Sequence, residues 1–301
     1  MRVRALLTGV TVLIPALMPA QGRPSTDIWT VTLSGAGVPR VGRAENLTHR
    51  LGYDNQPSFT PDGRALLYTR IEGSGPSDIY RLDLRTKATV NVTQSAVESE
   101  YSATPMPDGI HFSSVRVEAD STQRLWRFAL RGDEAPALLL ADIKPVGYHV
   151  WASDHTLALY VLGAALGTPN SPPATLQIAD LRTGKGEVVA TNIGRALQKI
   201  PARDAVSYLQ LGGDGAWIMS YDLRSGVRTP IAKAPPQSDY HIWTRDGALI
   251  AGSGSRLMIW NRDRWDVLAD LAVDGVHNIS RLALSPTGDR LALVADDHAS
   301  P

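Results

Sequence analysis

The sequence contains no cysteine, which excludes both disulfide bonds and a lipid anchor attached to a cysteine. Neither sign of charge is in excess, because 30 Lys and Arg residues balance 30 Asp and Glu residues. This balance gives no electrostatic reason to expect nucleic acid or an anionic membrane as a partner. Phenylalanine is scarce, with three residues, whereas seven Trp and nine Tyr lie mostly in segments that we expect to be strands. Packing between strands is the first explanation for these aromatic residues.

Long apolar runs are also lacking, apart from one at the N-terminus. Ala5–Leu17 follows the basic start Met1–Arg4, and its length is typical of a secretory signal rather than of a membrane span. We therefore expect residues 1–22 to be a signal peptide. The mature protein would then be exported, either periplasmic or secreted, without a transmembrane segment. A buried N-terminal strand is the alternative interpretation of the same run.

Short motifs for catalysis or metal binding are missing from the sequence. It has no Gly-x-Ser-x-Gly elbow, no His-Glu-x-x-His zinc helix, no phosphate-binding glycine loop and no EF-hand loop. The order of its Ser, His and Asp residues does not indicate that any three of them converge into a hydrolytic triad. From the sequence we therefore predict no catalytic residue, no metal ligand and no cofactor.

A repeated turn dominates the rest of the chain. Pro61-Asp62-Gly63 returns as Pro107-Asp108-Gly109, and a short apolar segment follows each copy. Asp-Gly supplies the positive φ that a tight hairpin requires. Six copies recur at intervals of 41 to 50 residues, with reference positions 62, 108, 154, 204, 246 and 287. Two middle copies lack glycine and are inferred from their spacing and flanking strands.

A second recurring element lies about 20 residues beyond each turn. Asp78–Leu84 alternates apolar and polar side chains, and Val90–Thr93 follows it as a short fourth strand. Four strands per repeat of this length are the signature of a propeller blade. The sequence therefore predicts an all-β fold, a six-bladed β-propeller with four antiparallel strands per blade, in a single domain over residues 23–301.

The sixth unit is incomplete, because little sequence follows its second strand, Arg290–Val294. Its missing partners match segments at the other end of the chain. Asp27–Leu33 has the third-strand pattern, and Glu45–Thr48 resembles the fourth-strand ending Asn91–Thr93. We therefore expect the N-terminal strands to join the C-terminal hairpin and close the ring. Such closure removes exposed sheet edges and ties down both termini.

These residues resemble a known repeat. Asn46-Leu47-Thr48, Asp54–Gly63 and Asp78-Ile79-Tyr80 are similar to the WD40-like repeat of TolB-type six-bladed propellers. The resemblance covers nearly the whole expected mature chain and implies the propeller fold. It implies no particular function, because the repeat is structural. TolB also carries a separate α/β domain ahead of its propeller, and we expect only the propeller part here.

The loops that lead into the innermost strands of a propeller gather at one face around the channel, where ligands and partners commonly bind. In five of the six blades these loops carry aromatic, imidazole or carboxylate groups. Such groups suit recognition of a peptide or a sugar, and packing between blades is the alternative. The candidate binding residues of the channel face are Tyr53, Asp54, Glu100, Tyr101, Tyr148, His149, Tyr240, His241 and His277.

Two functions are compatible with this sequence. The first, which we favour, is an exported, monomeric, non-catalytic propeller that binds a protein, peptide or glycan at the cell envelope through its channel face. The second is an enzyme of the lyase, lactonase or hydrolase type with a site at the channel mouth. A metal site there would need three or four ligands within reach of one ion. The candidate groups for such an enzyme are Asp54, Glu100, His149, His241 and His277.

Overall fold

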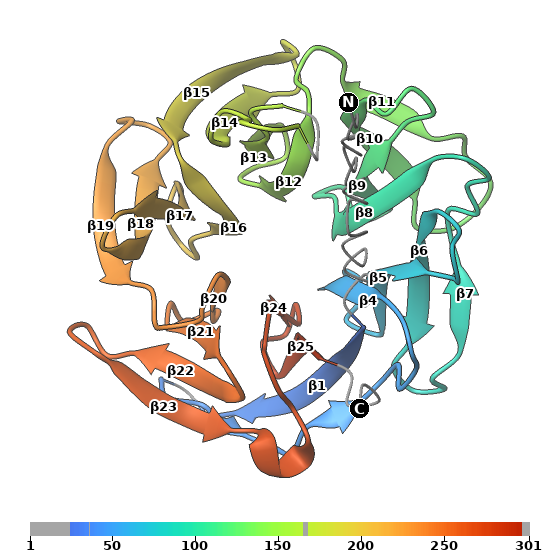
Figure 1. Ribbon diagram of the computed structural model, residues 1–301. Coiled ribbons are helices and arrows are strands. Elements are labelled where there is room, and N and C mark those ends of the chain that lie inside the picture. Colours follow the sequence, from blue (N-terminus) through green and yellow to red (C-terminus); the bar gives the residue numbers. More distant parts are fainter. Residues whose placement is uncertain (1–24, 36, 165–167, 297–301) are drawn as a thin grey trace, which may run out of the picture.

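Six β-sheets are arranged as blades around a central channel in the computed structural model, which describes residues 25–35, 37–164 and 168–296 (Figure 1). The predicted six-bladed, antiparallel propeller is confirmed. Besides the strands, the described residues form one short 3-10 helix, η1 (Ala272–Asp274). None of their helical segments is long and apolar enough to cross a membrane. The expected signal peptide, residues 1–22, lies outside the described residues.

Five blades are continuous in the chain, and their strands pair in sequence order from the channel outward (Figure 1). The first blade contains β4 (Asp54–Phe59), β5 (Ala65–Ile71), β6 (Ser77–Asp83) and β7 (Thr89–Asn91). The second contains β8 (Ser99–Pro105), β9 (His111–Val117), β10 (Gln123–Ala129) and β11 (Ala137–Leu140). The third contains β12 (Val146–Trp151), β13 (Thr156–Val161), β14 (Thr175–Asp180) and β15 (Lys185–Thr191). The fourth contains β16 (Ile193–Lys199), β17 (Ala205–Gly212), β18 (Gly215–Asp222) and β19 (Arg228–Lys233). The fifth contains β20 (His241–Trp243), β21 (Leu249–Ser253), β22 (Arg256–Trp260) and β23 (Trp265–Asp270).

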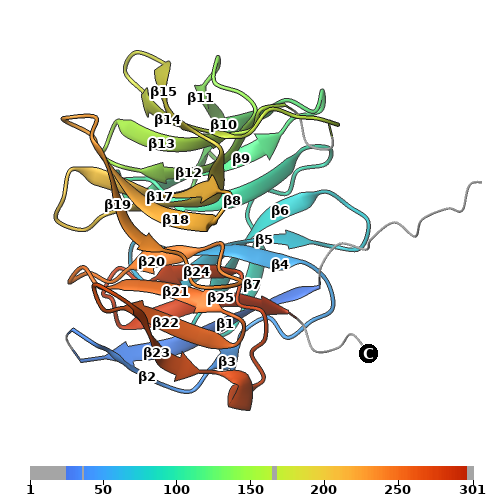
Figure 2. The ribbon, with the colours of Figure 1, turned by 60° about the vertical axis from the view of Figure 1, so that its left-hand side comes forward.

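The sixth blade is built from both ends of the described chain, as predicted. Its strands are β24 (Arg281–Leu284), β25 (Arg290–Asp296), β1 (Thr26–Ser34), β2 (Arg40–Val41) and β3 (Glu45–Asn46). β1 pairs with β25 over seven consecutive residue pairs, and β2 and β3 pair with the other edge of β1. The blue β1 and the red β25 lie side by side in both ribbon views (Figures 1 and 2). The ring is therefore closed by strand pairing between the two ends.

A repeated polar contact, which we call the Asp–Asn–Thr clasp, holds the outer strands of two blades. In the sixth blade, the carboxylate of Asp27 accepts hydrogen bonds from Asn46 Nδ2 at 2.7 Å and from Thr48 Oγ1 at 2.8 Å. The first blade repeats the clasp with Asp78, Asn91 and Thr93, at 2.8 and 2.9 Å. The recurring Asn-x-Thr sequence thus has a structural role, and the same clasp occurs in the composite blade.

The repeated Asp-Gly turn adopts the expected geometry. Gly63 has a φ of 66°, in the left-handed region that favours glycine. Asp62 Oδ1 accepts hydrogen bonds from Thr60 Oγ1 at 2.6 Å and from the backbone N–H of Arg64 at 3.1 Å. The turn therefore fixes the register between β4 and β5, which sets the side chains that the innermost strand directs to the channel.

The apolar cores lie between neighbouring blades. One cluster joins Ile28 and Val294 of the sixth blade to Phe59, Leu66 and Tyr68 of the first blade, all of them buried. Each sheet thus buries its faces against its neighbours, as expected for a structure made of repeats. The innermost strands are left free to line the channel.

Candidate functional site

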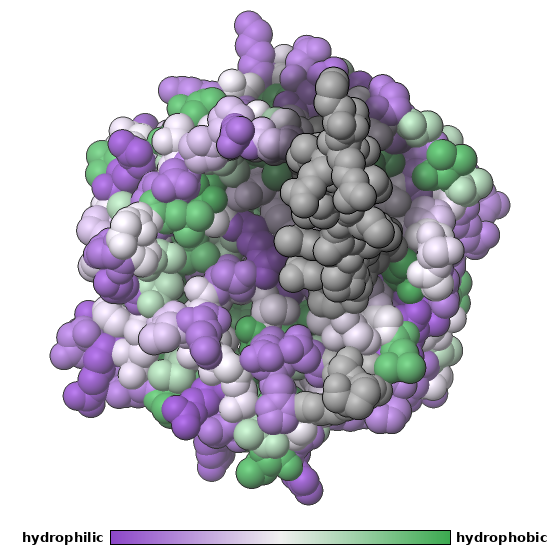
Figure 3. All heavy atoms as spheres, viewed as in Figure 1, coloured by the Kyte–Doolittle hydropathy of each residue, from purple (hydrophilic) through white to green (hydrophobic). Residues whose placement is uncertain are grey.

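A cavity of about 240 Å³ in the channel is lined by residues from all six blades. We single out one of these residues per blade, five of them on an innermost strand and Tyr240 directly before β20. We call these six residues the channel ring. They are Gln56, Ser102, Tyr148, Arg195, Tyr240 and Arg281. Where the space-filling view is open, hydrophilic side chains surround the hollow at the centre of the propeller (Figure 3). The channel ring is therefore polar and carries two cationic side chains.

Arg281 is the most deeply buried charged group of the channel ring, with 4% of its surface exposed. Its guanidinium lies over the rings of Tyr148 and Tyr240, with its carbon 5.0 and 5.2 Å from the two centroids. Its Nη2 donates a hydrogen bond to the hydroxyl of Tyr148 at 2.9 Å. Its Nε and Nη1 are buried and have no hydrogen-bond partner among the described residues. The cation is thus held between two aromatic rings with most of its donors unused.

Arg195 lies two blades away from Arg281 in the same ring. Its Nη2 donates to the carboxylate of Asp239, and the two side chains form an ion pair. Burial alone would lower the pKa of Arg195, but Asp239 and Tyr148 outweigh burial and raise it. Its Nε is a further buried donor without a partner in the described part of the chain. Arg195 therefore already has a counter-ion, whereas Arg281 has none among the residues that the structure describes.

A second cavity, of about 320 Å³, shares Gln56, Tyr148 and Arg195 with the first and is bordered by tyrosines. We call it the tyrosine cavity. Its four tyrosines come from three blades, and the rings of Tyr148 and Tyr160 meet edge to face at 5.6 Å. Burial, followed by the proximity of Tyr148, raises the pKa of Tyr53 to about 12. The tyrosines that line it are Tyr53, Tyr101, Tyr148 and Tyr160.

The structure thus brings three of the predicted tyrosines together in the tyrosine cavity, and Tyr240 lines the neighbouring cavity of the channel ring. It does not place the two predicted acids there. Asp54 and Glu100 are fully buried and line neither cavity. Each lies directly opposite an arginine of the adjacent strand, Asp54 opposite Arg70 and Glu100 opposite Arg116. Pairing within the blade therefore directs both acids away from the channel.

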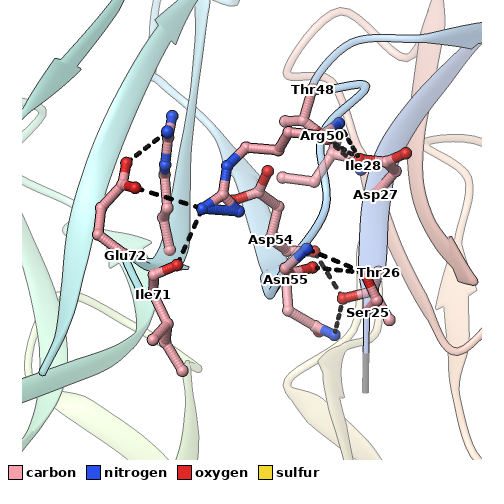
Figure 4. A network of polar contacts seen from close by, with 12 residues as sticks. Ser25, Thr26, Asp27, Ile28, Thr48, Arg50, Asp54, Asn55, Ile71 and Glu72 are labelled. Atoms are coloured by element: carbon pink, nitrogen blue, oxygen red, sulfur yellow. Dashed lines mark hydrogen bonds and ion pairs between the residues drawn. The ribbon is translucent and has the colours of Figure 1, made fainter. Parts of the chain in front are cut away.

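The surroundings of these two acids are those of structural groups. Asp54 Oδ1 lies 3.4 Å from Arg50 Nη1, and Arg50 also donates to the carbonyl of Ile71 at 2.9 Å (Figure 4). Glu100 Oε1 accepts a hydrogen bond from Arg116 Nε at 2.7 Å. Burial raises the pKa of Asp54 to about 6 and also raises the pKa of Glu100. Both acids are therefore buried beside arginines near the start of an innermost strand.

The three predicted histidines are in three different environments. His149 borders the channel-ring cavity but is 7% exposed, and His241 is fully buried. The Nε2 of His149 lies 2.6 Å from Ser113 Oγ, and that of His241 lies 2.8 Å from Ser207 Oγ. Burial lowers the pKa of both histidines to about 3, so both are neutral at physiological pH. The third, His277, is exposed and lines neither cavity.

Sequence reasoning missed Arg195 and Arg281, the two cations of the channel ring. The blade of Arg195 offers no aromatic or imidazole group at the loop that leads into it, so it gave no candidate. In the sixth blade the prediction selected His277, four positions before Arg281. Neither arginine has a local sequence signal, because the cavity that they line forms only where the innermost segments of all six blades meet.

The acidic and imidazole groups do not converge on one point. Across the described ranges, no group of three or more His, Asp or Glu side chains is placed so that it could hold a metal ion. The arrangement at the channel instead offers hydrogen-bond donors, aromatic rings and one uncompensated cation. Those groups can bind and orient a ligand.

Solved structures with the same architecture include TolB proteins and a gluconolactonase. A protein of Agrobacterium tumefaciens assigned as TolB superposes with a TM-score of 0.64 at 13% identity, over 91% of this chain and 99% of the other. TolB of Acinetobacter baumannii gives a TM-score of 0.57 at 12% identity, over 90% of this chain and 64% of the other. The chain has the TolB propeller fold. A gluconolactonase of Xanthomonas campestris gives a TM-score of 0.62 at 14% identity, over 92% and 96% of the two chains.

The TolB-type propeller assignment rests on structure and not on sequence similarity. No protein-family model matches the sequence, and no curated protein is significantly similar to it. At identities of 12 to 14%, the similarity shows the fold, and residue roles cannot be transferred. The function has to be inferred from the site itself.

Proposed function

We propose that this protein is an exported, non-catalytic propeller that binds a peptide segment of a partner protein at the cell envelope through the mouth of its channel. The observation that carries the proposal is the tyrosine cavity, which leads to buried arginine donors without partners. Tyrosine rings provide a large contact area at a low cost in conformational freedom, and their hydroxyls form hydrogen bonds. This combination is typical of surfaces that bind peptides.

An enzymatic function has less support from the site. A lyase or hydrolase would need an acid, a base or metal ligands near one reacting atom. The groups considered for that role are engaged elsewhere, since Asp54 and Glu100 pair with arginines while His149 and His241 bind serines. The gluconolactonase that shares the fold is too distant in sequence to assign a role to any residue here.

A site-specific photo-cross-linker tests the proposed function. We would place p-benzoylphenylalanine at Tyr101, which lines the tyrosine cavity, and at Trp217, an exposed residue of β18, as the matched control. After irradiation in an envelope extract, the cross-linked segment would be identified, synthesised as a peptide and tested as a competitor. We expect a peptide that cross-links only at Tyr101 and that competes.

Two results would contradict the proposed function. Identical products from Tyr101 and Trp217 would mean that the capture is nonspecific. A product at Tyr101 that consists only of glycan would mean that the channel mouth takes sugars and not peptides.

A further inference from the structure

Arg281 combines deep burial with a missing counter-ion, which is an unfavourable state for a charged side chain. Removing a charge from water costs several kcal/mol unless it is paired and hydrogen-bonded. Its contacts with Tyr148 and Tyr240 offset part of that cost, since a cation is attracted to the face of an aromatic ring, and more strongly when both are removed from water. Among the residues that the structure describes, no acidic side chain forms an ion pair with Arg281, so part of the cost of burying its charge is not offset. An anionic ligand would supply what is missing.

We propose that the Arg281 pocket binds a carboxylate group of the ligand. Nε and Nη1 carry three of the five N–H donors of a guanidinium, and in Arg281 both atoms are buried and unpartnered. A guanidinium binds the two oxygens of a carboxylate through two parallel N–H bonds, and in arginine such a pair always includes Nη2. Nη2 donates one of its two N–H bonds to Tyr148, so its second N–H can complete such a pair with either Nε–H or Nη1–H. Ser102 adds a further polar group, because its buried Oγ also lacks a partner among the described residues and lines the same cavity.

The charge of the pocket favours a carboxylate over a phosphate. Arg195 is already neutralised by Asp239, so Arg281 alone offers an uncompensated positive charge. One charge balances a monoanion, whereas a phosphate dianion would leave a negative charge buried in the cavity. The cavity of about 240 Å³ is also small, which suits a single acidic group rather than a chain that passes through it.

The rest of the ligand would lie in the tyrosine cavity. Gln56, Tyr148 and Arg195 line both cavities, so a ligand with its carboxylate at Arg281 reaches the tyrosines directly. The inference adds to the proposed function the chemical group that is recognised, a carboxylate. It rests on the proposed function in one respect, that the ligand enters through the channel mouth. A peptide brings such a carboxylate at its C-terminus or on an Asp or Glu side chain.

The first test uses acetate as the probe and acetamide as its neutral control, added to the mature protein. The side-chain Nε–H signal of Arg281, followed by ¹⁵N NMR and assigned with Arg281→Lys, should shift saturably with acetate and not with acetamide. The Nε–H signal of Arg116, which already donates to Glu100 at 2.7 Å, should not move. No shift with acetate, or an equal shift with acetamide, would overturn the inference.

The second test separates this inference from the proposed function. The cross-linked peptide would be made with free carboxylates and with all of them as amides, and the free acid should bind about tenfold more tightly or better. Equal binding of the two forms would overturn the carboxylate site and leave peptide binding intact. A shift of Arg281 with acetate and with glucuronate, but binding of no peptide, would retain the carboxylate site and refute the proposed function.

Arg281→Met distinguishes a binding role from a structural role. The variant keeps a long side chain between Tyr148 and Tyr240 but removes the buried charge. If Arg281 serves the ligand, the variant should lose the preference for the acid form of the peptide while its melting temperature stays the same or rises. A large fall in melting temperature would show that Arg281 supports the fold instead, and would overturn the inference.

Discussion

The Nε2 of His149, on the third blade, lies 2.6 Å from the Oγ of Ser113, on the second blade. Trp151 Nε1 donates to the same oxygen at 2.9 Å. The same contact occurs between the fourth and fifth blades, where Ser207 Oγ lies 2.8 Å from His241 Nε2 and 2.8 Å from Trp243 Nε1. We call the two contacts the Ser–His–Trp latches. The histidine of each latch is kept neutral by burial, which lowers its pKa.

The latches predict a loss of stability in acid. Because burial lowers the pKa of His149 and His241 to about 3, the unfolded chain takes up protons below about pH 6.5 while the folded protein does not. The stabilisation is therefore present above pH 6.5 and is lost as the pH falls toward 3. At pH 5 the loss should be about 2 kcal/mol for each latch.

Urea unfolding at pH 7.5 and pH 5 would measure that effect. His149→Gln and His241→Gln should each reduce the difference in unfolding free energy between the two pH values. The parent protein, unfolded under the same two conditions, is the reference for both variants. An unaltered difference in both latch variants would contradict the prediction.

Asp54 predicts a pH dependence of the opposite sign. Burial raises its pKa to about 6, above the ordinary value of 3.8, so the folded protein holds a proton that the unfolded chain releases between these values. The contribution to stability is therefore complete below pH 3.8 and is lost as the pH rises through 6. Relative to the parent, Asp54→Asn should gain up to about 3 kcal/mol of unfolding free energy between pH 4 and pH 8.

The control for Asp54 is Asp83, an acid in a turn. Hydrogen bonds from Thr86 lower the pKa of Asp83, so its effect on stability lies below pH 3.8, and Asp83→Asn should gain nothing relative to the parent between pH 4 and pH 8. Guanidinium unfolding of both variants over this pH range would measure the two gains. An equal gain in both variants would mean that Asp54 is not held in a desolvated site.

The Asp-Gly turn predicts a local loss of stability. Replacing Asp62 and Gly63 by alanine should lower the unfolding free energy by about 1 to 3 kcal/mol, because alanine tolerates positive φ poorly and the hydrogen bonds of Asp62 are lost. A Cβ on Gly63 would meet only Pro286 at 3.7 Å, so crowding does not contribute. Gly213→Ala, in open space and without a positive φ, is the control and should be nearly neutral. If Gly213→Ala lowers the unfolding free energy as much as the replacement of Asp62 and Gly63, the assignment of residues 62 and 63 to a tight turn is wrong.

The Asp–Asn–Thr clasp predicts that the composite blade is held in the same way as a continuous one. Asp27→Ala and Asp78→Ala should each lower the unfolding free energy by about 1 to 3 kcal/mol, because each leaves partly buried donors without a charged acceptor. The two losses should add in the double variant, since the clasps lie in different blades. Calorimetry would test this. If Asp27→Ala melts like the parent, the N-terminal strands contribute little to ring closure.

The sequence predicted the architecture well because the turn and the clasp repeat. Asp62-Gly63 and the Asn-x-Thr endings are local signals, and each copy strengthens the others. Which residues form the site depends instead on the direction of each side chain, which alternates from one residue to the next along the strands that line the channel. Tyr148 lines both cavities, whereas the side chain of its neighbour His149 forms a hydrogen bond with Ser113 of the next blade. A difference of one position in the strand therefore decides whether a side chain lines both cavities or joins two blades. Arg281 carries no local signal, since its character comes from Tyr148 and Tyr240 on distant blades.

The pairing of β1 with β25 also determines the order in which this chain can fold. The hydrogen bond from Thr30 Oγ1 to the carbonyl of Leu291 spans 261 positions, among the longest separations that a chain of this size allows. During synthesis, β1 is made first and has to wait for its partner until nearly every other strand exists. Contacts of such long range form slowly, and an unpaired strand edge promotes aggregation in the meantime. We therefore expect the β1–β25 junction to be the last to assemble and the point at which chaperones protect the nascent chain.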